Sequence, residues 1–222
     1  MSFLDRLLGD DRPRQGEEDP ERVPHWTVPA KRPGETGSGD PGPCRISLFA
    51  GNLTRAPADG ICTSTNPRLS LMGGTGAAVL QRAGWAVKRE CESILEHHRE
   101  ETGRETLEPG TAWTTTAGAL PFQGIVHCVA SDDSHRSSPE IVTQVVESAL
   151  NRAMEAGWES LAMPPFGTGH AHLDLDRAVT AMARQILASR VEVEEVVLVI
   201  QDPSAVPGVR QVMERELEDP QL

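Results

Sequence analysis

The sequence predicts an α/β fold of three layers, in which helices cover both faces of a mixed, mostly parallel central sheet. Two observations predict it. Short β-rich runs alternate with amphipathic stretches from residue 44 onward, and the apolar residues of those stretches recur at helical spacing. Alternation of this kind is typical of helices packed on both sides of a largely parallel sheet.

Six β-rich runs are expected to form the strands. They are ISLFA (46–50), ICTST (61–65), AWTTTAG (112–118), IVHCVAS (125–131), SLAMP (160–164) and VVLVIQD (196–202). The helical patterns between and after them cover residues 76–101, 139–156, 174–189 and 205–217. Val142, Val145, Val146 and Leu150 illustrate the apolar face that such a helix turns toward the sheet.

The N-terminal part of the chain differs in composition from the rest. Residues 9–43 are dense in proline, glycine and charge and poor in aliphatic side chains, so they cannot bury enough apolar area to offset the entropy of ordering. We therefore expect a disordered tail over residues 1–43, one domain over 44–218 and a short C-terminal tail over 219–222. A chain of 222 residues has room for one such domain and an appendage.

The composition also narrows the classes of function. A formal net charge of −12 argues against nucleic-acid binding, because phosphate backbones need a basic surface. Cys44, Cys62, Cys91 and Cys128 form no CxxC pair and no Cys/His cluster at zinc spacing, so we expect reduced thiols and no metal site. No apolar stretch has the length that crossing a bilayer requires. We expect a cytoplasmic monomer without a membrane partner.

Two glycine-rich loops lie where a predicted strand meets a predicted helix. In the first, a strand ends at Asn66, and Gly73, Gly74 and Gly76 lead into a helix; in the second, residues 167–169 read Gly-Thr-Gly. Glycine lets the backbone approach a ligand closely, and N–H groups at a helix start bind phosphate. One such loop is more often an ordinary turn. Two at the carboxyl edge of one sheet predict a diphosphate site between two helix N-termini.

These motifs resemble the macrodomain family. The resemblance rests on GNLT (51–54), ADGICTSTNPRLSLMGGTGAAVLQRAG (58–84), PGTAWTTTAGALPFQGIVHCVASD (109–132), ESLAMPPFGTG (159–169) and VEEVVLVIQD (193–202), in the family's order and spacing. It covers nearly all of residues 44–218 and is nearest to the histone-tail and bacterial stand-alone branch. It implies a macrodomain that binds ADP-ribose, free or attached to a protein, or a related nucleotide, with no cofactor.

The resemblance also assigns roles to individual positions. Asn66 matches an asparagine that hydrogen-bonds the distal ribose; its alternative role is a turn-former whose side chain bonds its own backbone before Pro67. Asn52 stands where the family has an aspartate that accepts a hydrogen bond from the adenine amino group. The expected ligand-binding residues are Asn52, Leu53, Asn66, Gly73, Gly74, Thr75, Gly76, Ala77, Pro165, Phe166, Gly167, Thr168, Gly169, His170 and Gln201.

Several positions depart from the family's pattern. Asn52 keeps an acceptor oxygen but lacks the aspartate's charge, so its bond to the amino group is expected to be weaker. Gln201 replaces an aromatic residue that stacks on adenine, and Ala171 and His172 replace an aromatic–glycine pair. Gly76 stands where a hydrolytic subclass has an aspartate. Binding is therefore expected to be stronger at the diphosphate-ribose end than at the base.

Three functions stay open on the sequence. The first is a binding module for ADP-ribose or an ADP-ribosylated protein, because no general base is evident beside the loops. The second is an ADP-ribosyl hydrolase, which removes ADP-ribose from proteins or deacetylates O-acetyl-ADP-ribose. Its candidate catalytic residues are Asn66, His170 and His172, since an imidazole beside the phosphate loop can act as an acid or base. The third is an interaction scaffold whose cleft has decayed.

Overall fold

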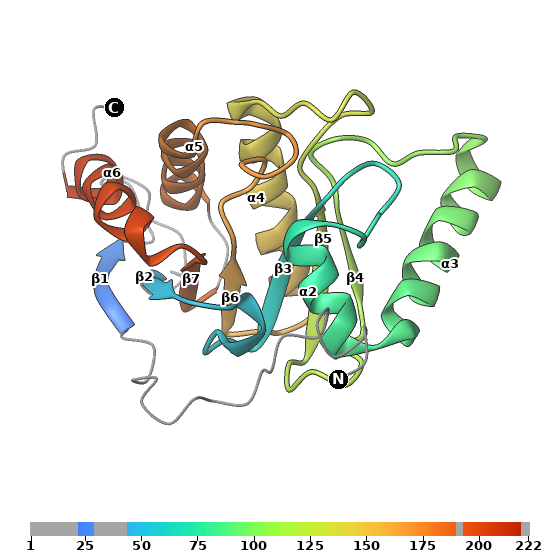
Figure 1. Cartoon of the computed structure of the whole chain (residues 1–222), viewed down its shortest axis with the longest axis horizontal. Coiled ribbons are helices and arrows are strands. Elements are labelled where there is room, and N and C mark those ends of the chain that lie inside the picture. Colours follow the sequence, from blue (N-terminus) through green and yellow to red (C-terminus); the bar gives the residue numbers. More distant parts are fainter. Residues whose placement is uncertain (1–21, 29–43, 190–192, 219–222) are drawn as a thin grey trace, which may run out of the picture.

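The computed structural model describes residues 22–28, 44–189 and 193–218. Within them, a mixed sheet of seven strands is flanked by helices on both faces (Figure 1), so the predicted three-layer α/β fold is confirmed. The strands are β1 (Arg22–Val28), β2 (Cys44–Ala50), β3 (Gly60–Thr65), β4 (Ala112–Thr115), β5 (Gly124–Val129), β6 (Ser160–Met163) and β7 (Glu195–Ile200). Their order across the sheet is β1-β2-β7-β6-β3-β5-β4. Only β1 and β4, at the edges, run antiparallel to their neighbours among the described strands.

The helices divide the apolar interior into two layers. They are α2 (Gly74–Ala83), α3 (Trp85–Thr102), α4 (Pro139–Glu155), α5 (Leu175–Ala188) and α6 (Val206–Glu218), with short 3-10 turns η1 (Leu53–Arg55) and η2 (Pro203–Ala205). Along β7, Val196 and Leu198 join the core beneath α4, α5 and α6, whereas Val197 and Val199 join the core beneath α2 and α3. This alternation follows from the two-residue period of a strand, and it buries β7 from both sides.

The sequence predicted one helix over residues 76–101, and the structure corrects this to two. Helix α2 ends at Ala83, and α3 begins at Trp85. Gly84 between them has φ +89°, a conformation outside the helical range that side-chain-bearing residues rarely adopt. The apolar period continues across the break, so periodicity did not reveal it.

The predicted disordered tail is wrong for residues 22–28. They form β1, which pairs antiparallel with β2 at one edge of the sheet (Figure 1). The pairing register shifts between Val23 and His25, at Pro24, which has no N–H for a ladder. Proline lowers strand propensity and is tolerated at edges and bulges, so composition misjudged this segment. The rest of that tail (1–21, 29–43) and residues 219–222 lie outside the described residues.

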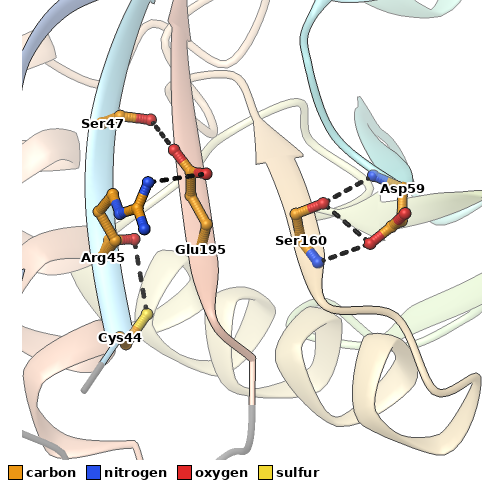
Figure 2. Close-up of polar contacts among 6 residues, drawn as sticks. All are labelled: Cys44, Arg45, Ser47, Asp59, Ser160 and Glu195. Carbon is orange, nitrogen blue, oxygen red and sulfur yellow. Dashed lines mark hydrogen bonds and ion pairs between the residues drawn. The ribbon is translucent and has the colours of Figure 1, made fainter. Parts of the chain in front are cut away.

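Side chains fasten the strands together at the amino edge of the sheet (Figure 2). Asp59, just before β3, accepts hydrogen bonds from the Ser160 backbone N–H and hydroxyl, both at 2.9 Å, at the start of β6. Gln123 donates to the same carboxylate at 3.1 Å. Nearby, Ser47 of β2 donates to Glu195 of β7 at 2.6 Å. These bonds hold the first residues of the strands in register at the amino edge. The loops that could bind a ligand lie at the opposite, carboxyl edge.

We expect Asp59→Asn to lower the free energy of unfolding by about 1 kcal/mol at pH 7, because charge-assisted hydrogen bonds are lost. Burial alone would raise the pKa of Asp59, but hydrogen bonds from Ser160, Gln123 and Glu159 hold it below its usual value. The stabilisation is therefore present above the unfolded-state pKa and lost as the pH falls through the lower folded-state pKa. Urea unfolding at pH 7 and pH 3 measures both effects. Asp133→Asn, an exposed carboxylate, is the matched control, and equal losses in the two variants would contradict the prediction.

Candidate functional site

A cavity of about 830 Å³ opens at the carboxyl edge of the sheet. Its walls are the loop between β3 and α2, the loop between β6 and α5, the β5–α4 loop and the segments that follow β2 and β7. This volume suits a nucleotide-sized ligand, and the edge is where parallel α/β sheets bind their ligands.

Most of the residues expected at the ligand lie together in this cavity. Twelve of the fifteen line it: Asn52, Leu53, Asn66, Gly73, Gly74, Thr75, Pro165, Gly167, Thr168, Gly169, His170 and Gln201. The other three do not. Gly76 is buried, and a Cβ there would lie 3.1 Å from the Leu71 Cα. Ala77 lies in the first turn of α2, and Phe166 is fully buried in the core beneath its loop.

The first glycine loop presents unpaired donors to the cavity. Gly73 is the N-cap of α2, and no side chain of the described residues caps this helix. The first backbone N–H groups of a helix have no partner within it, and those of Gly74 and Thr75 have no acceptor among the described residues. The buried hydroxyl oxygen of Thr75 is also without a partner there. Uncapped N–H groups at a helix start form an anion site.

The second loop offers its own backbone rather than a helix end. The N–H groups of Gly167, Thr168 and Gly169 have no acceptor in the described part of the chain, and Gly167 has φ +75°. The Thr168 hydroxyl donates to the Pro165 carbonyl at 3.0 Å, which ties the loop together. Consecutive free N–H groups in a turn form a concave anion site.

The start of the second predicted helix lies at the cavity, where Leu175 is a lining residue, but unlike the start of α2 it carries a side-chain cap. Helix α5 begins at Leu175, and the Asp174 side chain caps it by accepting from the Arg177 N–H at 3.1 Å. Asp176 adds a second negative charge in the first turn. The two negative charges offset the positive end of the helix dipole, and they disfavour the binding of an anion there. The cap and the charge of Asp176 make the start of α5 a weaker anion site than the uncapped start of α2, and a diphosphate between two helix N-termini stays a prediction.

The Asn66 side chain serves the turn at one atom and leaves the other free. Its Oδ1 accepts from the backbone N–H of Arg68 at 3.1 Å and of Ser70 at 3.2 Å. Because both donors are backbone groups, a flipped amide would bring two donors together, and the orientation is set. The Nδ2 group has no partner among the described residues, and Asn66 lines the cavity. Asn66 therefore offers a ligand hydrogen-bond donors.

The segments after β2 and β7 form the other end of the cavity. Ala50 pairs with Ile200, so Asn52 and Gln201, which follow them, come to the same edge. The Asn52 Oδ1 accepts from the Thr54 N–H at 3.0 Å and the Thr54 hydroxyl at 2.9 Å. The oxygen expected to receive an adenine amino group is thus already used by the N-cap of η1.

Histidines approach the cavity without an acid–base partner. His170 lines it, and a Cβ on Gly73 would lie 3.0 Å from the His170 Cε1, so this ring spans the two glycine loops. His172 has φ +53° and is not among the lining residues. Neither imidazole has a carboxylate partner among the described side chains. His135, on the β5–α4 loop, also lines the cavity.

Sequence reasoning missed the lining residues that no glycine motif marks. Seven of them come from strand ends and neighbouring loops, and all but the methionine are polar: Ser64, Thr65, Ser70, Met72, Ser131, His135 and Asp202. Met72 is 73% exposed at the cavity, an unusual place for a large apolar side chain. The strand-end positions could have been found from their place at the carboxyl edge, whereas nothing in the sequence marks His135. The structure has no group of three metal-binding side chains in its described ranges, and no described helix has the length and apolarity to cross a membrane.

Comparisons with known proteins agree with this architecture. A family model described as Macro domain matches residues 62–182. An uncharacterized protein of Mycobacterium tuberculosis is 30% identical over 145 residues, which cover 65% of this chain and 38% of the relative. The chain therefore matches little more than a third of that relative's length. An O-acetyl-ADP-ribose deacetylase of Citrobacter rodentium is 28% identical over 127 residues, or 56% of this chain and 68% of the enzyme.

Solved structures share the fold. The Oceanobacillus iheyensis macrodomain with ADP has a TM-score of 0.68 at 20% identity, covering 79% of this chain and 93% of the other. The Trypanosoma brucei macrodomain in complex with ADP-ribose has a TM-score of 0.62 at 19% identity, covering 77% and 68%. The fold and the cavity define a protein of the macrodomain class. The chain belongs to the macrodomain family.

Proposed function

We propose that this chain is a recognition module that binds ADP-ribose, free or attached to a protein, or a closely related nucleotide. One observation carries the proposal: residues 74–75 and 167–169 line the same cavity, and their backbone N–H groups have no acceptor among the described residues. Structural neighbours of the same fold hold ADP or ADP-ribose, which supports the assignment of a nucleoside diphosphate to this cavity.

The negative charge of the chain favours a phosphate site that is built from backbone N–H groups. A net charge of −12 disfavours the approach of a diphosphate, and the lining residues within the described ranges include neither lysine nor arginine. Backbone N–H groups and the positive end of α2 provide local attraction without a mobile cation. In the proposed complex the diphosphate lies between the two glycine loops. The distal ribose then lies beside Asn66, and the base lies toward Asn52 and Gln201.

Calorimetric titration with ADP-ribose and with ADP tests the proposal. We expect saturable one-to-one binding of both, with the phosphates supplying a common part of the affinity. AMP should bind more weakly than ADP, because it leaves part of the donor set unpaired. No heat and no thermal stabilisation by either diphosphate at millimolar concentration would refute the proposed function.

We expect Asn66→Asp to weaken ADP-ribose binding roughly tenfold while ADP, which lacks the distal ribose, loses much less. The remaining carboxylate oxygen still accepts from Arg68 and Ser70, but the donor toward the ligand becomes an acceptor. Titrations of both ligands measure the difference. Asn151→Asp makes the same chemical change at an exposed position of α4 and should alter neither affinity. An equal loss for ADP and ADP-ribose would contradict the assignment of Asn66 to the distal ribose.

A second candidate function is hydrolysis of an ADP-ribosyl ester. The observation that favours it is the position of His170, which follows the second glycine loop and whose ring lies close to Gly73 of the first loop. The likeness to a deacetylase also favours it. Incubation with O-acetyl-ADP-ribose and with mono-ADP-ribosylated protein, followed by detection of free ADP-ribose, tests it. Binding without turnover of any of these substrates would remove this candidate and leave the recognition module.

A further inference from the structure

The His170 ring lies between the two sets of backbone donors that line the cavity. His170 follows Gly169 of the second loop directly, and a Cβ on Gly73 of the first loop would lie 3.0 Å from the His170 Cε1 and 3.6 Å from each ring nitrogen. Gly73 is the N-cap of α2, and His170 itself lines the cavity. A diphosphate held by the backbone N–H groups of both loops would therefore lie next to this imidazole.

Both ring nitrogens of His170 are available to a ligand. The side chain is exposed and has no hydrogen bond or ion pair within the described residues. A neutral imidazole donates from one nitrogen and presents a lone pair at the other, whereas an imidazolium donates from both. The charged oxygens of a diphosphate only accept hydrogen bonds, so they match the protonated ring at both of its nitrogens.

The cavity lining contains few other charged side chains. In the described ranges its titratable residues are His135, His170 and Asp202. Protonation of the two histidines therefore changes the lining from one net negative charge to one net positive charge. The other charged residues around the second loop lie outside the lining: Arg68 on the first loop, Asp174, Asp176 and Arg177 at the start of α5, and Asp132, Asp133 and Arg136 on the β5–α4 loop.

We propose that His170 binds the diphosphate as an imidazolium and is the side-chain cation of this site, so that the ligand binds together with a proton. This inference rests on the proposed function, because it needs a diphosphate between the two glycine loops. It adds a titrating side chain to a site otherwise built from backbone donors. Binding is then tighter at the acidic end of the range from about pH 5 to 8, in which histidines ordinarily change charge.

ADP-ribose is the ligand for the test, because its own charge is constant over this range. Both of its phosphates are linked on two sides, so neither has a second ionisation near neutral pH. ADP ends in a free phosphate, and such a group takes up a proton at about pH 6. The proton uptake of ADP itself would be added to that of the protein.

The experiment titrates the full chain with ADP-ribose by calorimetry between pH 8 and pH 5.5, with the melting temperature recorded at each pH. We expect the affinity to rise roughly tenfold as the pH falls, because the imidazolium adds a charge-assisted contact. Titrations at pH 7 in two buffers of different ionisation enthalpy, neither of them phosphate, should show net proton uptake on binding.

Two kinds of variant locate the titrating group. His170→Gln keeps a side-chain donor but cannot take up a proton near neutral pH, so its affinity should not change with pH and its binding should take up no proton. His170→Asn is a second variant of this kind, should His170→Gln fail to fold. His97→Gln removes an exposed histidine of α3 outside the lining and should keep the pH dependence of the unaltered protein.

The outcomes separate this inference from the proposed function. Affinity for ADP-ribose that is independent of pH in the unaltered protein overturns the inference, and so does a pH dependence that persists in His170→Gln. Loss of the pH dependence in His135→Gln alone would also overturn it, since the other histidine of the lining would then be the cation. Absence of ADP-ribose binding at every pH would instead refute the proposed function.

Discussion

Gly169→Glu is expected to weaken the binding of ADP-ribose and ADP by at least about a hundredfold while the fold is kept, since it puts charge repulsion and steric overlap where phosphate binds. Gly169 lines the cavity in the second loop, and a Cβ there meets nothing within 4 Å. Its φ is outside the left-handed range, so glutamate brings no backbone strain. Calorimetric titration together with the melting temperature measures binding and folding separately.

The position is chosen because the neighbouring glycine would confuse the two effects. Gly167 has φ +75°, and a Cβ there would lie 2.3 Å from the Ser137 hydroxyl oxygen, so any substitution at Gly167 strains the loop itself. Gly208→Glu is the matched control, because Gly208 lies on α6 outside the lining residues and also has open space. Unchanged affinity in Gly169→Glu, or an equal loss in Gly208→Glu, would contradict a phosphate site at this loop.

The stability of the protein is expected to fall by about 2 kcal/mol between pH 7 and pH 5 on account of His127 alone. This histidine of β5 is fully buried between two threonines: Nδ1 lies 3.0 Å from the Thr63 hydroxyl and Nε2 lies 2.8 Å from the Thr115 hydroxyl. Burial lowers the pKa of His127 to about 4 from a usual value of 6.5, because desolvation disfavours the charged ring.

The sign follows from this downward shift. The unfolded chain takes up a proton near pH 6.5, whereas the folded protein resists protonation until about pH 4. The stabilisation is therefore complete above pH 6.5 and is lost progressively as the pH falls toward 4. Urea unfolding from pH 7 to pH 4.5 measures the slope, and His127→Gln should flatten it whatever its effect at pH 7.

A direct titration provides a second measurement for His127. NMR of the His127 ring should show a neutral imidazole at pH 6. A midpoint for His127 near 6.5, or the same pH slope in His127→Gln, would contradict the prediction. His127 is fully buried in β5 and lies outside the cavity lining.

Local sequence patterns predicted the positions of the two loops and most of the strands, because each depends on short-range chemistry. Gly73, Gly74, Gly167 and Gly169 line the cavity, and the apolar runs of β3, β5 and β7 are buried from both faces. Boundaries that depend on one backbone angle were not predictable in this way. The break at Gly84 is the example, since glycine is also tolerated inside a helix.

Strand β1 and the side-chain cap of helix α5 were not predicted, for a related reason. Pairing of residues 22–28 depends on β2 offering a free edge, and the composition of the segment itself contains no trace of that partner. The Asp174 cap weakens the α5 N-terminus as an anion site, although the order of strand, loop and helix suggested an uncapped helix start. The first outcome depends on the neighbouring strand β2. The second depends on the hydrogen bond that the Asp174 side chain already accepts.

The sequence by itself determined the α/β class, the resemblance to the macrodomain family and the two glycine loops, because periodicity and glycine placement are local properties. Only the tertiary structure decided which donors stay free. Asn52 and Asn66 read alike in the sequence as possible ligand contacts. In the folded chain each turns its oxygen to its own backbone, at Thr54 and at Arg68 and Ser70. Each asparagine can therefore offer a ligand its Nδ2 donors, because both lone pairs of its Oδ1 already accept hydrogen bonds.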